Sequence, residues 1–212
     1  MNKKQKPKDL LTRDGNIAIL FVNTASAKRQ SLESYTGLIS WALEAGLLTE
    51  LESDRLTAAA NASPATAEAV FRDAEKLRQH LETIFRHGAR KRAAPEDDIQ
   101  AINNRLVALY NRRSLSFAHG TYRCVLENRG ELESVLWPIL LATDKLLTGK
   151  GYQKLVECAD EECRLLLLSQ RERRWCSRRC SHRNASRRHY RAVQKPRKEE
   201  IKRRSARLAP TV

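Results

Sequence analysis

The sequence predicts a mainly α-helical domain, of α+β class because of one short β-hairpin, followed by a small treble-clef-like module. Apolar residues recur at helical spacing over most of residues 32–147, and a pair of short β-prone runs interrupts them once. Four of the 5 cysteines fall within residues 158–180, in a polar segment. The length of 212 residues suits one medium domain or two small ones.

The first two elements are expected before residue 47. The apolar run from Ile17 to Val22 fits either a buried strand or the first turns of a buried helix, and its spacing favours neither. From Ser31 onward, apolar residues recur every three or four positions until Gly46 follows. This pattern predicts an amphipathic helix that ends at Gly46.

Two further helices are expected between residues 63 and 110. Ser63-Pro64 supplies a cap and a first-turn proline for a long helix, whose apolar stripe ends before Gly88. Pro95 is followed by three acidic residues, which favour a helix N-terminus because they complement its positive end. The apolar face of this third helix continues to Tyr110.

A β-hairpin is expected after the third helix. Leu115 to Ala118 and Thr121 to Leu126 are β-prone runs, and His119-Gly120 separates them. Cys124 lies in the second run with no nearby partner cysteine or histidine for a metal site, so it is expected to be a buried small hydrophobe.

Helical spacing returns from Leu132 to Leu147, after a turn expected at residues 128–130, and Pro138 should kink this helix. Gly149 and Gly151 then close the domain. We expect three parts: a helical domain over residues 10–150, the cysteine-containing module over residues 151–193, and a basic, disordered tail over residues 194–212.

The charge of the chain points to a polyanionic partner. The formal net charge is +15, and residues 151–212 carry 18 basic and 7 acidic side chains. Nucleic acid is the usual partner of such a segment. No apolar run is long enough to span a bilayer, so no membrane partner is expected. The apolar run after the N-terminal lysines is too short for a signal peptide, and a cytoplasmic protein is expected.

The four clustered cysteines have the spacing of a metal site. Cys158 and Cys163 are separated by four residues, Cys176 and Cys180 by three, and twelve residues lie between the pairs. This layout fits one Zn²⁺ held tetrahedrally by four thiolates. The first pair would lie on a loop, residues 165–168 would form a strand, and the second pair would lie at a helix N-terminus. The result is a treble-clef-like four-cysteine zinc finger, in which the metal supplies the folding free energy that so polar a segment lacks.

A zinc site closed by four cysteines leaves no coordination position open, so the zinc is expected to be structural and the protein not to be an enzyme. A nuclease that uses His182, Asn184 and His189 is the enzymatic alternative, but it lacks a convincing carboxylate or second metal set. His182 and His189 are expected to face phosphate or solvent instead.

The expected finger helix and its flanks are rich in arginine, and Glu172 is the single acidic residue between positions 171 and 191. Guanidinium groups neutralise phosphates and can read guanine edges in a major groove. Duplex DNA is therefore the expected partner, with RNA- or ribosome-associated binding and thiol-based redox sensing as alternatives. The expected nucleic-acid contacts are Arg173, Arg174, Arg178, Arg179, Arg183, Arg187, Arg188 and Arg191.

Two sets of motifs carry a resemblance to known families. The finger segment contains Cys158-Ala159-Asp160, Cys163, Arg173-Arg174-Trp175-Cys176-Ser177, Cys180, Arg183 and Arg187-Arg188-His189. In these residues it resembles the CGNR zinc fingers of bacterial proteins. Here the tetrapeptide that names the family reads Cys180-Ser181-His182-Arg183, and the last two cysteines are one residue closer than in the usual pattern.

The front segment contains Phe21-Val22-Asn23-Thr24, Trp41-Ala42, Ala45-Gly46-Leu47-Leu48 and Trp137-Pro138. In these motifs it is similar to the ABATE domain that accompanies the CGNR finger. The resemblance implies a bacterial, stress-related transcription regulator associated with the nucleoid. It also implies that the N-terminal domain binds an unknown small ligand or protein partner.

Overall fold

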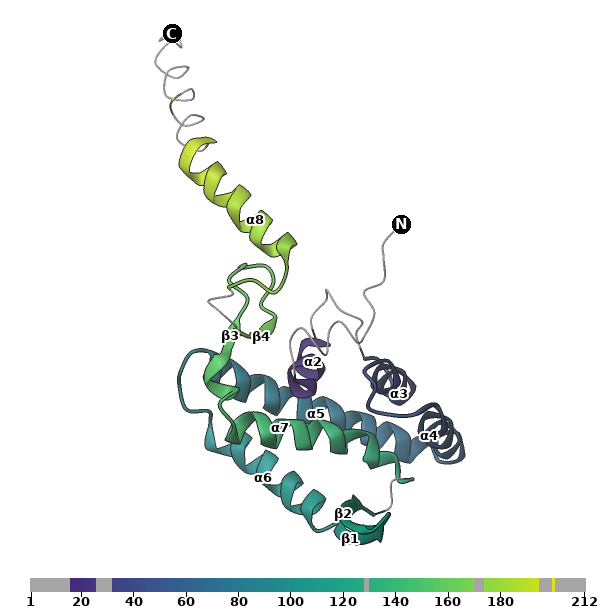
Figure 1. The fold of residues 1–212 in the computed structure, drawn as a ribbon. Helices are drawn as coiled ribbons and strands as arrows, with labels where there is room; N and C mark the ends of the chain where they lie inside the picture. The colour runs from purple at the N-terminus through teal and green to yellow at the C-terminus, as the bar shows by residue number, and fades with distance from the viewer. Residues whose placement is uncertain (1–15, 26–31, 128–129, 170–173, 195–199, 201–212) are drawn as a thin grey trace.

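The computed structural model describes residues 16–25, 32–127, 130–169, 174–194 and 200. Helices gather around one apolar core, and a smaller unit ending in a protruding helix follows them (Figure 1). The helices of the larger part are α2 (Ile17–Asn23), α3 (Tyr35–Glu44), α4 (Glu50–Ala62), α5 (Pro64–Ala89), α6 (Glu96–Tyr110) and α7 (Trp137–Thr148). The remaining elements are the hairpin β1 (Arg113–Ala118) and β2 (Thr121–Leu126), the 3₁₀ turns η1 (Leu132–Leu136) and η2 (Tyr152–Lys154), the hairpin β3 (Leu155–Glu157) and β4 (Leu166–Leu168), and α8 (Arg178–His189), which continues into the π-helical turn η3 (Tyr190–Gln194).

The long helix α5 is the centre of the core, because α2, α3, α4 and α6 all pack against it. Pro64 stands in its first turn as expected, although Ser63 makes no side-chain cap. Gly88 does not end the helix but lies buried inside it. A Cβ at this position would lie 2.5 Å from the ring of Tyr152, so the glycine makes room for that ring.

Helix α4 was not expected from the sequence. Only Ser53 and Leu56 of its thirteen residues are buried, so no apolar stripe marks it. It is fixed at its start by a capping box, in which the Thr49 hydroxyl accepts from the Glu52 N–H and the Glu52 carboxylate accepts from the Thr49 N–H.

The ambiguous run at residues 17–22 is a helix. Asn16 caps α2 by accepting from the Ala18 N–H at 2.8 Å, and every residue of α2 after the first is buried. The next expected helix is also present, but it begins after Ser34, whose hydroxyl accepts from the Gly37 N–H. Ser31 lies outside the described residues. Gly46 ends this segment with a φ of +72°, a conformation that favours glycine.

The kink expected at Pro138 is wrong. The 3₁₀ turn η1 precedes the proline, and Pro138 stands in the first turn of α7, where a missing N–H costs no hydrogen bond. The chain therefore changes helix type before the proline rather than bending at it. Of the turn expected at residues 128–130, only Gly130 belongs to the described residues.

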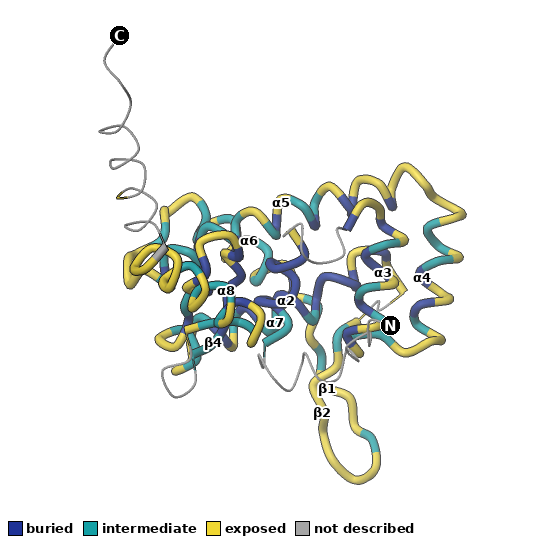
Figure 2. Tube along the Cα trace, turned by 90° about the horizontal axis from the view of Figure 1, so that it is seen from above, coloured by how far each residue is buried: buried dark blue, intermediate teal, exposed yellow. Residues whose placement is uncertain are grey.

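The expected hairpin is confirmed, and the burial expected for Cys124 is wrong. His119 and Gly120 form its two-residue loop with φ values of +52° and +78°, as a type I′ turn requires. The hairpin projects from the body and is exposed along most of its length (Figure 2). Cys124 is exposed, and among the described residues no other helix or strand covers the face on which it lies.

The small unit after Gly151 shares the core of the helical part. Leu155 of β3 and Leu166 of β4 are buried among the core residues, and the two strands pack on α5 and α2. The Asn23 side chain donates to the Leu166 carbonyl at 2.8 Å and accepts from the Leu166 N–H at 2.9 Å. The expectation that this segment is too polar to have a core is therefore wrong, because apolar burial and hydrogen bonds join it to the helical part.

Within the described residues, none of the helices has the length and apolar character needed to cross a membrane.

Candidate metal centre

The four cysteines that were singled out in the sequence meet at one point. Their Sγ atoms all lie within 4.8 Å of one another. Two separations are 3.4 Å, between Cys163 and Cys176, and 3.5 Å, between Cys176 and Cys180. A tetrahedral zinc with Zn–S bonds of about 2.3 Å places its sulfurs roughly 3.8 Å apart. The donor set and its spacing therefore fit a zinc ion, and the separations are too long for disulfides.

The first cysteine pair lies on the turn that joins β3 to β4. The Cys158 N–H donates to the Leu165 carbonyl at 2.8 Å, and the Cys163 N–H donates to the Asp160 carbonyl at 2.7 Å. Arg164 adopts a left-handed conformation with φ of +52°, which helps turn the chain back into β4. We call this turn, residues 158–163, the knuckle.

The second pair lies at the start of α8, as expected, but only Cys180 belongs to the helix. Ser177 is the N-cap, and its hydroxyl accepts from the Cys180 N–H at 3.3 Å. Cys176 precedes the cap, so the two thiols do not sit on consecutive turns of one helix. The Cys176 N–H instead donates to the Cys158 sulfur at 3.4 Å, which draws the two pairs together.

The cluster lies inside a small apolar shell. Cys158, Cys163 and Cys180 are buried, and Cys176 is half-buried. The side chains packed around them are Leu165, Leu167, Val156 and Trp175. A site that excludes water in this way slows ligand exchange and strengthens thiolate binding to a cation.

The thiols differ in acidity although they touch. A hydrogen bond from the Cys176 thiol lowers the pKa of Cys158 to about 5. The same hydrogen bond raises the pKa of Cys176, and burial raises the pKa of Cys163. The Cys158 thiol therefore loses its proton more easily than the thiols of Cys163 and Cys176.

A buried carboxylate ties the knuckle to α8. Asp160 has no exposed surface, and it accepts from Arg183 Nε at 2.7 Å and from Arg187 Nη1 at 3.2 Å. The Glu162 N–H also points at this carboxylate, at 3.3 Å. Burial raises the pKa of Asp160, but the hydrogen bonds from Arg183, Cys180 and the Glu162 N–H, together with the charge of Arg183, outweigh it and hold this pKa below its usual range.

The other knuckle carboxylates face the same helix. Glu162 pairs with Arg183 at 3.2 Å and also with Arg187, and Glu161 pairs with Arg191 at 3.6 Å. The structure thus places three of the expected nucleic-acid contacts, Arg183, Arg187 and Arg191, in ion pairs within the finger. Sequence reasoning missed these pairs because 23 residues separate Asp160 from Arg183, although the Asp-Glu-Glu run at 160–162 was a signal.

The other expected contacts that belong to the described residues face solvent. Arg178, Arg179 and Arg188 on α8 are exposed, as are His182 and His189. Arg174 is exposed just before the helix, and Arg173 lies outside the described residues. Since Cys180, Arg183 and Arg187 recur at a spacing of three or four, they occupy one side of α8, and the exposed arginines occupy the rest.

The metal centre is also fixed against the helical part. Glu157 of β3 pairs with Arg86 at 3.3 Å and with Arg90 at 3.1 Å, both on or next to the end of α5. Arg86 further donates to the Arg164 carbonyl at 3.3 Å. Together with the Asn23 hydrogen bonds, these contacts orient β3 and β4 on α5 and α2.

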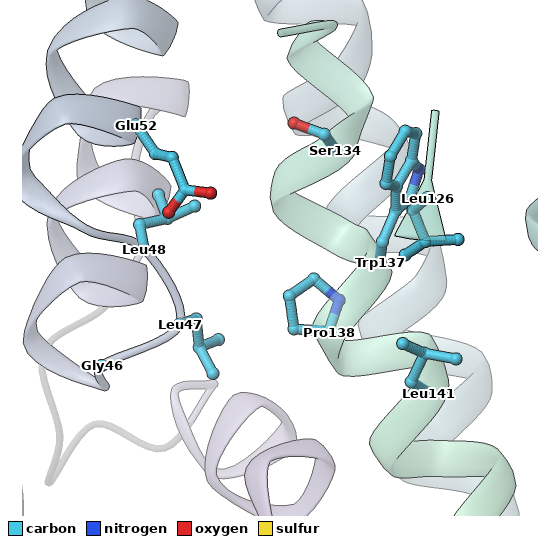
Figure 3. Close-up of a pocket in the computed structure, with 9 residues that line it drawn as sticks. All are labelled: Gly46, Leu47, Leu48, Glu52, Leu126, Ser134, Trp137, Pro138 and Leu141. Atoms are coloured by element: carbon cyan, nitrogen blue, oxygen red, sulfur yellow. The ribbon is translucent and has the colours of Figure 1, made fainter. Parts of the chain in front are cut away.

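A second candidate site is a cavity of about 290 Å³ in the helical part (Figure 3). It lies between the segment joining α3 to α4 and the start of α7, so the front motifs at residues 45–48 and 137–138 meet there. Its single charged lining residue is Glu52. The lining residues are Gly46, Leu47, Leu48, Glu52, Leu126, Ser134, Trp137, Pro138 and Leu141.

Two family models match the chain. Residues 15–150 match ABATE, described as "Putative stress-induced transcription regulator". Residues 154–192 match the CGNR zinc finger. No curated protein matches the chain. The first match covers more than half of the chain, and the second contains all four clustered cysteines.

Proposed function

The chain belongs to the ABATE family and carries a CGNR zinc finger, and from this premise we propose that it is a transcription regulator that binds duplex DNA through α8. The observation that carries the proposal is the division of α8 into two sides. One side is bound to the cysteine cluster and the knuckle, and the other presents arginines to solvent.

In this proposal Cys158, Cys163, Cys176 and Cys180 hold one zinc ion per chain, whose role is structural. A zinc ion would join the knuckle to the start of α8 and leave no position for substrate, so the protein is not an enzyme. Asp160 supports the same join through Arg183 and Arg187. The helix is then held rigidly at its N-terminus, where a DNA-reading helix meets the groove.

The exposed arginines Arg174, Arg178, Arg179 and Arg188 are the proposed phosphate and base contacts. They lie at or near the N-terminus of α8 or along its free side, and the helix protrudes from the body (Figure 1). A helix about 18 Å long has the dimensions to enter a major groove. Arg183 and Arg187 position this helix rather than contact the nucleic acid.

The test is a titration of labelled duplex DNA at several salt concentrations. The Arg178→Ala/Arg179→Ala/Arg188→Ala variant should bind more weakly, and its slope of log K against log salt should fall by about 0.9 for each phosphate that the variant no longer neutralises. Arg55→Ala/Arg72→Ala/Lys76→Ala is the matched control, because it removes the same charge from positions on α4 and α5, away from the finger. Equal reductions in the two variants, or tighter binding to RNA than to DNA, would overturn the proposal.

The helical part is proposed to respond to a small ligand or protein partner. The cavity between the α3–α4 segment and α7 is the site that supports this role, because its lining is mainly apolar and contains the single charged side chain of Glu52. The protein would act on chromosomal DNA in the cytoplasm.

A further inference from the structure

The hairpin β1–β2 has one apolar and one polar face. The register pairs Leu115 with Cys124 and Phe117 with Tyr122, and the two rings stand 5.1 Å apart. Residues directly opposite one another, and residues two apart along a strand, share a face. The other face carries Ser114, Ser116, Thr121, Arg123 and Val125.

The apolar face is turned to solvent. Leu115 is 74% exposed, Phe117 63% and Tyr122 69%. A two-stranded hairpin is at best marginally stable in water unless a further strand or another surface covers it. Single exposed apolar residues are ordinary, but this set is contiguous and lies on a projecting arm (Figure 2).

The same face leads into the cavity. Leu126 lies on it, two residues from Cys124, and is also one of the cavity's lining residues beside Trp137 (Figure 3). Apolar side chains therefore extend from Phe117 and Tyr122 near the tip, through Leu126, to the cavity, and Arg113 beside Leu126 is the charged residue of the arm on this face.

We propose that the occupant of this surface is the β1–β2 hairpin of a second copy of the chain, packed face to face and antiparallel about a two-fold axis. This inference names the partner of the cavity proposed above and is independent of nucleic-acid binding. In such a pair the tip of each arm lies over the base of the other, so the aromatic residues near the tip reach the partner's cavity. Both copies then use the same surface, so the assembly stops at a dimer.

Length and buried area both fit a second copy. Each strand of six residues spans about 20 Å, and since both arms are the same length, a tip and a base coincide. The apolar side chains of two arms bury on the order of 1,000 Å² in total, which suits a weak dimer.

Sedimentation velocity of the zinc-loaded full chain, over a micromolar concentration series, tests the inference. The wild type should form dimers as the concentration rises, and Leu115→Thr/Phe117→Thr should stay monomeric. The matched control, Ser116→Thr/Arg123→Thr, changes the opposite face to the same residue type and should dimerise like the wild type. Because these side chains are exposed, circular dichroism should show the same helicity and thermal midpoint for all three proteins.

Cross-linking gives the second readout. Cys124 lies near the middle of the apolar face, so two copies related by the proposed axis bring their Cys124 thiols close together. A short bismaleimide should join two wild-type chains, and Cys124→Ser should abolish the product.

A wild type that stays monomeric, or a dimer that survives Leu115→Thr/Phe117→Thr and yields no Cys124 cross-link, would overturn the inference. Binding of the monomer to lipid vesicles through Phe117 would also overturn it, because the occupant would then be a membrane. None of these results alters the zinc content or the salt dependence of duplex binding, so failure here is distinguishable from failure of the proposed function.

Discussion

Replacing Asp160 by asparagine should weaken zinc binding although this residue is not one of the cysteines. The carboxylate accepts hydrogen bonds from Arg183 and Arg187 and so joins the knuckle to α8. Asparagine has nearly the same shape, but it carries no charge, and its amide N–H₂ would face one of the two guanidinium groups.

The size of the effect follows from the burial of the three groups. Asp160 has no exposed surface, whereas the side chains of Arg183 and Arg187 are 27% and 25% exposed. Water can therefore replace part of what the arginines lose, but it cannot reach the position of the carboxylate. Removing a partner that orients metal ligands typically costs 10–100-fold in affinity, or about 2 kcal/mol. We expect a loss of zinc affinity in this range for Asp160→Asn.

The assay is competition for zinc between the protein and a chromophoric chelator. Glu161→Gln is the matched control, because it also removes one knuckle carboxylate, but Glu161 is 69% exposed and pairs with Arg191 at 3.6 Å. The control should lie within about twofold of the wild type, since an exposed ion pair contributes little.

The pH dependence checks the cause. The folded protein lowers the pKa of Asp160, so the stabilisation is fully present above the ordinary pKa of an aspartate and is lost as pH falls through the lower value. The difference in the free energy of unfolding between wild type and Asp160→Asn should therefore disappear in acid. Equal zinc affinities at neutral pH, or a difference in the free energy of unfolding that persists at the lowest pH, would refute the reasoning.

Three further predictions concern how the two parts are joined. Asn23→Ala should lower the free energy of unfolding by about 3 kcal/mol, because it leaves the buried N–H and C=O of Leu166 without partners. Replacing the exposed Asn103 by alanine should change this free energy little. Denaturant unfolding measures both. Gly88→Ala should be destabilising by about 1–3 kcal/mol because its Cβ would meet the Tyr152 ring. Tyr152→Ala should relieve this clash in the double variant. Additive effects of the two substitutions on the free energy of unfolding would contradict this. A fragment ending at residue 150 should melt at a lower temperature than the full chain and bind a hydrophobic dye, since Leu155 and Leu166 no longer cover the core; an unchanged melting temperature would show that the finger adds nothing to it.

The sequence predicted those elements that carry a strong local signal. The stripe of α5, the acidic start of α6 and the His119-Gly120 turn each specify structure within a few residues, and the structure confirms all three elements. Helix α4 was missed because only two of its residues are buried, so tertiary contacts and a capping box hold it instead of an apolar face.

Burial was harder to predict than secondary structure. The alternation in β1 and β2 shows that the hairpin has two different faces, but it does not say whether anything covers the apolar one. Cys124 was therefore assigned to a core that does not extend to it. Leu155 and Leu166 show the opposite error. The finger segment was expected to be too polar for a core, but these two residues are buried in the core of the helical part, against α5 and α2.

The cysteine cluster was predicted from spacing alone. The division of the arginines between ion pairs with the knuckle and exposure to solvent was not predicted. Cysteines at positions 158, 163, 176 and 180 have a spacing typical of metal ligands, and their sulfurs lie within 4.8 Å of one another. The arginines looked like one continuous basic face. Only the fold shows that the 160–162 carboxylates neutralise one side of α8 and leave the other side free to bind.

The most direct test of the central claim is duplex binding before and after zinc is removed. The net charge of the side chains is the same apart from the cysteines, so binding by the basic residues alone predicts little change when a chelator strips the metal. If zinc holds α8 in position, the stripped protein should bind labelled duplex more weakly and with a lower salt slope, and added zinc should restore both. Stripped protein that binds as tightly as the zinc-loaded form, with the same slope, would contradict the account.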